Sequence, residues 1–172
     1  RILSAGPSND PLDLYSARSV KVYTDGALGS RGAALLEPYS DRVGHSGLLL
    51  TSKGQLRAIF SQYIQAGFQV AIHAIGDKGN RIGLDEVEHA YTTIGGRELR
   101  HRIEHSQVVA LEDIPRFKSL DVIPSMQPTH ATSDMNMAED RLGSKRLKGA
   151  YAWRSFLDQG SVLVSGSDFP IE

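Results

Sequence analysis

The feature that most constrains the fold is a regular alternation of short apolar, β-branched segments with longer segments of helical periodicity. Alternation at this spacing is typical of βαβ crossovers and a parallel sheet. The expected strands are 19–24, 68–73, 102–107, 122–127 and 161–166. The expected helices run from Thr51 or Ser52 to Ala66 and over 80–93, 111–120 and 151–157, while 26–50 and 128–147 are expected to be loops.

Composition limits the class of protein. A chain of 172 residues with 40% hydrophobic and 23% charged residues has the size and balance of one globular domain without an internal boundary. Its net charge of -1 excludes the basic field of a nucleic-acid-binding surface. No cysteine is present, so thiolate metal sites and cysteine nucleophiles are excluded.

No segment has the pattern of a signal peptide or of a membrane-spanning helix, so we expect a cytoplasmic protein without a membrane partner. The sequence starts at Arg1 without an initiator methionine and stops abruptly at Glu172. We therefore expect both ends to be cut from a longer chain.

Polar side chains distinguish between the two architectures that this alternation allows, an open doubly wound sheet and a (β/α)8 barrel. His73, His105, Gln127 and Asp168 each lie at or next to the carboxyl end of an expected strand. Chemistry spread over many strand ends is typical of a barrel, and no glycine-rich phosphate turn follows the first strand. A whole barrel takes roughly 250 residues, so five strands predict the C-terminal part of an incomplete barrel.

Imidazole and carboxylate groups at separate strand ends, without thiolates, suit a catalytic divalent metal such as zinc. His73, His105 and Asp168 are the candidate ligands. The alternative for each is a structural side chain that binds loop backbone. Lys21 lies within an apolar strand, so it is paired, neutral or chemically altered if it points into a barrel. It is either an exposed edge lysine or a lysine carbamylated by CO2 that bridges two metals.

Five motifs in this order resemble the amidohydrolase superfamily, and more closely its YtcJ-like (amidohydrolase-3) branch. They are the segments 20–31, 72–77, 102–107, 125–130 and 166–170, which together span nearly the whole chain. The resemblance implies a (β/α)8 barrel with a small β-sandwich. It also implies that Lys21, His73, His105 and Asp168 are metal ligands on the fourth, fifth, sixth and eighth strands. The His-x-His pair of the family's first strand has no counterpart among the six histidines.

The chemistry that the resemblance implies is hydrolysis of a carbon–nitrogen bond in a small, amide-like, non-peptide substrate. Asp168 would take a proton from a metal-activated water and pass it to the leaving nitrogen. Three further residues are candidates for substrate binding. Arg31 would pair with a carboxylate, and His130 would hydrogen-bond a carbonyl oxygen beside Gln127. The alternative for Arg31 and for His130 is an ordinary solvated side chain.

Two other functions remain open. Without the first-strand histidine pair, the chain is also consistent with a non-catalytic barrel fragment whose open sheet edges self-associate into a homo-oligomer. A metal-free hydrolase that uses only histidine and aspartate ranks lower, because no serine lies in a Gly-x-Ser-x-Gly turn.

Overall fold

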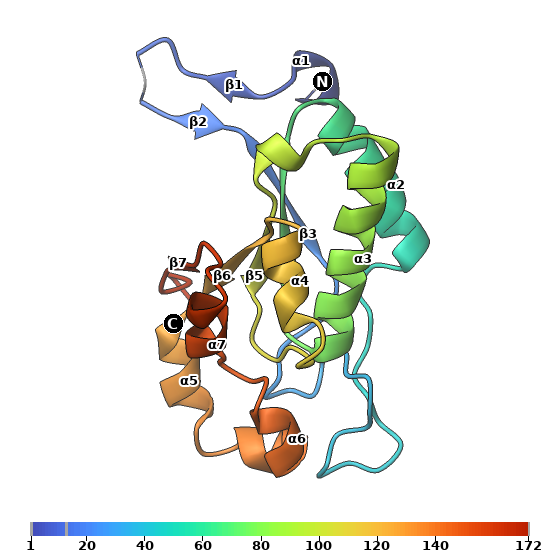
Figure 1. Ribbon diagram of the computed structural model, residues 1–172, viewed down its shortest axis with the longest axis vertical. Coiled ribbons are helices and arrows are strands. Elements are labelled where there is room, and N and C mark those ends of the chain that lie inside the picture. Colours follow the sequence, from blue (N-terminus) through green and yellow to red (C-terminus); the bar gives the residue numbers. More distant parts are fainter. Residues whose placement is uncertain (1, 13, 172) are drawn as a thin grey trace.

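A parallel five-stranded sheet forms the centre of the computed structural model, which describes residues 2–12 and 14–171 (Figure 1). The strands follow one another in space in chain order, as β3-β4-β5-β6-β7. They are Ser19–Tyr23 (β3), Gln69–Ala74 (β4), Arg102–His105 (β5), Ile123–Met126 (β6) and Val164–Ser165 (β7). The expected series of parallel β/α units from a (β/α)8 barrel is therefore confirmed, and within the described residues the sheet does not close.

Four helices cover one face of this sheet, and a short 3-10 helix, Arg97–Leu99, precedes β5. Figure 1 shows α2 and α3 beside β3 and β4, with α4 and α7 beside β6 and β7. Their bounds are Lys53–Gln65 (α2), Asp77–Thr93 (α3), Ile114–Ser119 (α4) and Trp153–Asp158 (α7). Apolar side chains of these helices pack against the sheet, among them Leu56, Phe60, Leu84, Val87, Phe117 and Phe156.

The register of the sheet decides which side chains face the helices. Paired residues of parallel strands share a face, and successive residues alternate between faces. Val22, Ile72 and Ile103 pair in this way and belong to the buried core under the helices. The next row of paired residues consists of Tyr23, His73 and Glu104. This row therefore lies on the face that the helices leave uncovered.

Helix α2 begins at the expected cap. The Ser52 side chain accepts a hydrogen bond from the Gln55 backbone N–H, and the Gln55 side chain accepts one from the Ser52 backbone N–H. This reciprocal pair satisfies two N–H groups that lack helical partners. The helix ends before Gly67, which adopts the left-handed conformation with φ of 82°.

The expectation that 128–147 is a loop is wrong, because two helices occupy it. They are Pro128–Asp134 (α5) and Ala138–Leu147 (α6). Proline at the first helical position favours α5. Acidic residues in the first turn and basic residues in the last turn of α6 complement its dipole. The polar residues that indicate a loop instead form the exposed surface of these two helices.

Other boundaries differ by a few residues. Helix α3 begins at Asp77, before the expected Asn80, and the Asp77 carboxylate accepts from the Lys78 and Leu36 backbone N–H groups. Asn80 is instead a fully buried side chain whose amide donates to several backbone carbonyls. Strand β7 is limited to two exposed residues at a sheet edge, which is shorter than the predicted 161–166.

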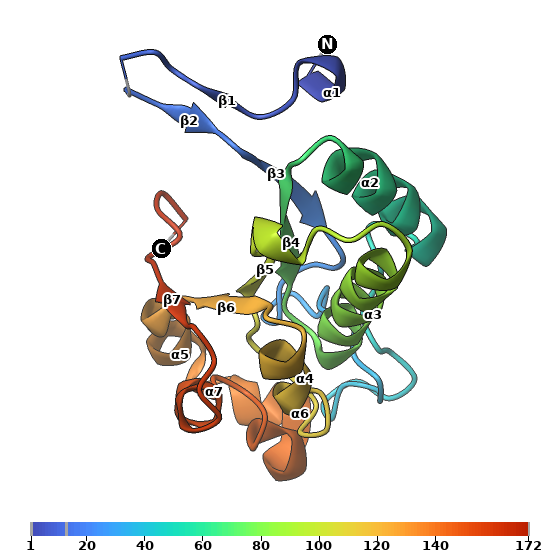
Figure 2. The same ribbon diagram turned by 45° about the horizontal axis from the view of Figure 1, so that its top comes forward.

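The first residues of the chain form an arm that the sequence does not predict. A short helix, Ile2–Ala5 (α1), precedes an antiparallel pair of Ser8–Asn9 (β1) and Ser16–Ala17 (β2). Figure 2 shows this arm extending away from the sheet. Among the helices of the described residues, none combines the length and the apolar character needed to cross a membrane.

A second hydrophobic cluster lies where the strands end. It joins the segment after β3 to helix α6 and to the residues that follow β5, through Leu28, Leu35, Tyr39, Ile75, Val108 and Leu142. The long segment after β3 is therefore anchored at the same end of the sheet as the candidate site residues.

Candidate functional site

Two histidine rings meet at the carboxyl ends of neighbouring strands. His73 is the next-to-last residue of β4, and His105 is the last residue of β5. Their ring centroids are 4.5 Å apart with the rings nearly perpendicular. The Tyr23 ring from β3 lies 4.9 Å from the His73 ring on its other side. The parallel sheet thus brings the predicted residues His73 and His105 to one edge, and Tyr23 joins them there.

His105 reaches this position through an irregular backbone. Its register partner is Ala74, so regular alternation would turn the His105 side chain away from His73. Instead, φ is 77° at His105 and 43° at Ser106. Positive φ is rare for residues with a side chain, and such strain clusters at functional sites. The irregularity turns the imidazole toward His73.

His130 and Asp168 complete a cluster with His105. One potential ligand atom from each of the three residues lies within 4.8 Å of the others. His130, on α5, stacks its ring on that of His105 with the centroids 5.4 Å apart. The His130 Nε2 lies 3.9 Å from the Asp168 Oδ2. Asp168 follows β7 with φ of 62°.

The electrostatics of the site favour neutral imidazoles. Burial, together with the neighbouring His105 and Lys21, lowers the pKa of His73 to about 3. Burial also lowers the pKa of His105, against a hydrogen bond to Gln127 that raises it. A neutral imidazole is the form that binds a metal.

His73 also carries an unsatisfied polar atom. Its Nε2 is buried without a hydrogen-bond partner among the described residues, and the Asp25 Oδ1 lies 3.8 Å away. A buried polar atom without a partner carries a desolvation cost that a ligand relieves. With His105, His130 and Asp168 beside it, this donor set fits a divalent metal such as zinc.

Gln127 supports His105 from behind. Its Oε1 lies 2.8 Å from the His105 Nδ1, and its Nε2 donates to the Ser125 carbonyl at 3.2 Å. Gln127 lies outside the lining of the pocket formed by the histidines. The structure therefore brings Gln127 to the site as a neighbour of His105, and its expected contact with substrate stays a prediction.

Lys21 lies on β3 and faces the same pocket. Its ammonium lies 5.5 Å from the centre of the Tyr23 ring. Partial burial lowers the Lys21 pKa, while the carboxylates of Glu104 and Asp168 oppose that shift. A lowered pKa increases the fraction of neutral amine, which is the form that reacts with CO2. Carbamylation of Lys21 stays a prediction.

Asp25 is the residue that joins the strand ends. It is fully buried, and its carboxylate accepts backbone hydrogen bonds from Ile75 at 3.0 Å and from Gly76 and Ala34 at 2.8 Å. Burial raises its pKa to about 6, against these hydrogen bonds, which lower it. Asp25 thus fixes the segment after β3 against the turn after β4.

The histidines at the strand ends line one pocket of about 340 Å³. Lys21, His73, His105, His130 and Asp168 all belong to its lining, so five of the seven predicted site residues converge. Three further polar residues of the lining are not predicted from the sequence. They are Tyr23, Gln107 and Asp134. Asp134 follows His130 by four residues, a spacing that would have indicated a shared face had 128–147 been recognised as helical.

Arg31 lies apart from this pocket. Its guanidinium makes two hydrogen bonds to the Asp41 carboxylate, at 3.0 Å and 2.8 Å. Arg141 of α6 contacts the same carboxylate. Arg31 therefore joins two segments of the chain in this structure, and its expected pairing with a substrate stays a prediction.

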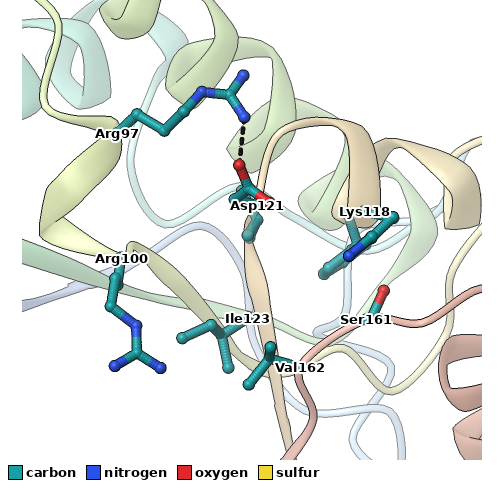
Figure 3. A pocket seen from close by; sticks show the side chains of 9 residues that line it. Arg97, Arg100, Lys118, Asp121, Ile123, Ser161 and Val162 are labelled. Carbon is teal, nitrogen blue, oxygen red and sulfur yellow. Dashed lines mark hydrogen bonds and ion pairs between the residues drawn. The ribbon is translucent and has the colours of Figure 1, made fainter.

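A second pocket, of about 280 Å³, lies at the opposite ends of the strands (Figure 3). Figure 3 shows its lining, in which Arg97 and Asp121 form an ion pair. Its other polar lining residues are Arg100, Lys118 and Ser161. Because the lining contains no histidine, the groups suited to metal chemistry gather only in the first of these two pockets.

Comparison with known proteins agrees with this geometry. The chain is 39% identical over 153 residues to "Protein LONG AFTER FAR-RED 3" of Arabidopsis thaliana, with 88% of this chain and 26% of that protein covered. It is 35% identical over 155 residues to "Putative amidohydrolase YtcJ" of Bacillus subtilis, with 90% of this chain and 28% of that protein covered. The chain thus spans little more than a quarter of these relatives.

A solved structure shares the fold. It is an uncharacterized metal-dependent hydrolase from Pyrococcus furiosus, with a TM-score of 0.85 and 34% sequence identity. The match covers 97% of this chain and 33% of that structure. The sequence pattern of the Amidohydrolase family matches residues 7–172. The fold and the clustered histidines agree with this match, which extends over nearly the whole chain. The chain therefore belongs to the amidohydrolase family.

Proposed function

We propose that this chain forms part of a metal-dependent hydrolase that cleaves a carbon–nitrogen bond in a small, amide-like, non-peptide substrate. The observation that carries the proposal is the convergence of His73, His105, His130 and Asp168 in one pocket at the strand ends. Amidohydrolase family membership and the likeness to a metal-dependent hydrolase support it.

His73, His105 and Asp168 would hold one or two divalent ions, zinc being the metal best suited to these ligands, with Lys21 as a carbamylated ligand. When bound, such an ion supplies a water of lowered pKa and a polarised carbonyl oxygen. The neutral state of His73 and His105 prepares them for this role, because burial lowers the pKa of each.

Asp168 and His130 would handle the proton and the developing charge. The Asp168 carboxylate accepts the proton of the attacking water and transfers it to the nitrogen as the carbon–nitrogen bond breaks. His130 lies 3.9 Å from Asp168 and donates a hydrogen bond to the carbonyl oxygen from the same side of the pocket. Asp168, at a third exposed, keeps contact with solvent.

The test uses the complete product of the gene, loaded with Zn²⁺ and assayed against a panel of non-peptide amides. Asp168→Asn is expected to lower kcat by about 100-fold or more, because it removes the proton acceptor. Asp158→Asn, on the exposed side of α7, is the matched control and is expected to leave kcat unchanged. If the Asp168→Asn variant hydrolyses every substrate of the enzyme at the wild-type rate, the proposal is wrong.

A second candidate is a non-catalytic, self-associating fragment. It is favoured by the open sheet, in which β3 and β7 form unpaired edges and Tyr23 is 49% exposed. Sedimentation velocity on the 172-residue chain tests it. Discrete oligomers that bind no zinc would support this function, whereas a monomer that binds zinc would exclude it. Residence in the cytoplasm and the absence of a nucleic-acid partner stay predictions.

A further inference from the structure

Three polar side chains that the proposed chemistry does not use form a closed network, and two of them, Gln107 and Asp134, line the pocket. Gln107 follows β5, Asp134 ends α5, and Tyr151 precedes α7. The Tyr151 hydroxyl donates to the Asp134 Oδ2 at 2.7 Å, and the Gln107 Nε2 contacts the same oxygen. The Gln107 Nε2 also lies 3.2 Å from the Tyr151 hydroxyl oxygen.

The network fixes the orientation of the Gln107 amide. A carboxylate only accepts hydrogen bonds, so the amide nitrogen of Gln107 must face Asp134. The amide oxygen then points away from the carboxylate. Within the described part of the chain, neither the Gln107 Oε1 nor the Asp134 Oδ1 has a hydrogen-bond partner. Two acceptors are therefore left for a ligand in a pocket that both residues line.

The backbone holds this arrangement in place. The Tyr151 N–H donates to the Gln107 carbonyl at 2.7 Å, and Val108 pairs with Ala150 as an isolated bridge. Burial, and then the hydrogen bond to Asp134, raise the pKa of Tyr151, so its hydroxyl stays protonated and keeps donating. Both side chains that donate to Asp134 in the described part of the chain are thus neutral.

Among the residues that the structure describes, no cationic side chain forms an ion pair with the Asp134 carboxylate. By contrast, the Glu86 and Glu104 carboxylates each pair with an arginine. A partly buried carboxylate without a cation attracts a positively charged ligand group. Leu28 and Ile75 line the same pocket and supply apolar surface.

The helix fixes the distance from this carboxylate to the reacting centre. His130 and Asp134 are four residues apart on α5, so they share one face, with Cβ atoms about 6 Å apart. A substrate whose carbonyl lies at His130 and Asp168 therefore reaches Asp134 with a group a few covalent bonds farther along.

We propose that Asp134 and Gln107 determine specificity by binding a protonated amine of the substrate, a few bonds from the scissile amide. The inference rests on the proposed function, since it names the substrate class of the same pocket. Asp134 supplies the charge, Gln107 supplies a second acceptor, and Tyr151 is a positioning residue.

The test compares two probes of nearly equal shape, N-acetylpropanediamine, which ends in an ammonium group, and N-butylacetamide, which ends in a methyl group. Binding to the zinc-loaded complete gene product is measured by calorimetry, and hydrolysis of both probes is measured in parallel. The wild-type protein is expected to bind the amine at least about tenfold more tightly, as for a hydrogen bond to a charged group.

Variants separate charge from packing. Asp134→Asn is expected to abolish the preference for the amine, whereas Asp134→Glu keeps the charge and part of the preference. Tyr151→Phe lowers the preference about threefold because the carboxylate loses a positioning donor. Asp140→Asn, an exposed residue of α6, is the control and is expected to keep the full preference.

Equal affinity of the wild-type protein for the two probes overturns this inference without any variant. An unchanged preference in Asp134→Asn also overturns it. If the preference depends on Asp134 but neither probe nor any other amide is hydrolysed, the proposed function fails while the amine site stands. If amides are hydrolysed without a preference for the amine, the amine site fails while the proposed function stands.

Discussion

The amide oxygen of Gln127 lies 2.8 Å from Nδ1 of His105, and this contact joins the end of β6 to the end of β5. Because the Gln127 Nε2 donates to the Ser125 carbonyl, its oxygen must face the ring, and the His105 Nδ1 must donate. The His105 Nε2 is then unprotonated in the neutral ring. Gln127 thus sets the tautomer that a metal ligand needs.

Replacing Gln127 should therefore weaken metal binding without removing a ligand. We expect Gln127→Leu to lower zinc affinity by about 10- to 100-fold, the usual effect of losing a partner of a ligating histidine. Affinity is measured by competition with a coloured chelator. Gln65→Leu, at the exposed end of α2, is the control and should leave affinity unchanged. Wild-type affinity in Gln127→Leu would show that Gln127 does not orient His105.

Acid should destabilise the protein through His101. This histidine is fully buried, and its Nδ1 accepts a hydrogen bond from the Val70 N–H at 3.0 Å. Burial lowers its pKa to about 4, from an unfolded value of 6.5. The unfolded state therefore binds more protons between these two values, so the His101 contribution is complete above pH 6.5 and is lost as pH falls toward 4.

The expected loss is on the order of 3 kcal/mol between pH 7 and pH 4. Urea unfolding across this range measures it for the wild-type protein and for His101→Gln, which should show a shallower loss toward acid. Asp25 titrates in the same range with the opposite sign, because burial raises its pKa to about 6. The difference between the two proteins isolates His101, and identical pH profiles would contradict this account.

Two glycines should respond in opposite ways to alanine. A Cβ at Gly76 would lie 2.0 Å from the Ala34 carbonyl oxygen, in the turn that Asp25 fixes. A Cβ at Gly54 in α2 meets nothing within 4 Å. Gly76→Ala should therefore destabilise the fold by about 2 kcal/mol or more, whereas Gly54→Ala should stabilise it by about 0.5–1 kcal/mol.

Thermal unfolding of both variants checks this pair. The predicted order of melting temperatures is Gly54→Ala above wild type and Gly76→Ala below it. If Gly76→Ala has the same melting temperature as the wild-type protein, the close approach of the β4–α3 turn to Ala34 is not a feature of the folded state.

Much of the fold could be predicted from the sequence because its signals are local. Alternating apolar segments indicate the parallel strands, and the Ser52 cap and Gly67 bound α2. The polar segment 128–147 is wrongly predicted to be a loop because α5 and α6 bury few side chains, chiefly His130, Ala138 and Leu142. Helices that are largely exposed have little apolar periodicity to recognise.

The site was less predictable, since its geometry depends on contacts between distant segments. Strand ends indicate His73, His105 and Asp168, but regular alternation cannot anticipate the positive φ that turns His105 toward His73. The ion pair of Arg31 with Asp41 depends on the folded loop. Likewise, nothing local indicates that Asp134 would meet residues that follow β5 and precede α7.

The central claim is that the clustered histidines hold a divalent metal. Elemental mass spectrometry on the complete gene product, after incubation with zinc and dialysis, tests it most directly. We predict about one or two ions per chain for the wild-type protein, a comparable content in the control His89→Leu on α3, and less than about a tenth of that content in His105→Leu. A wild-type protein without metal, or a His105→Leu variant that retains its full content, would contradict the account.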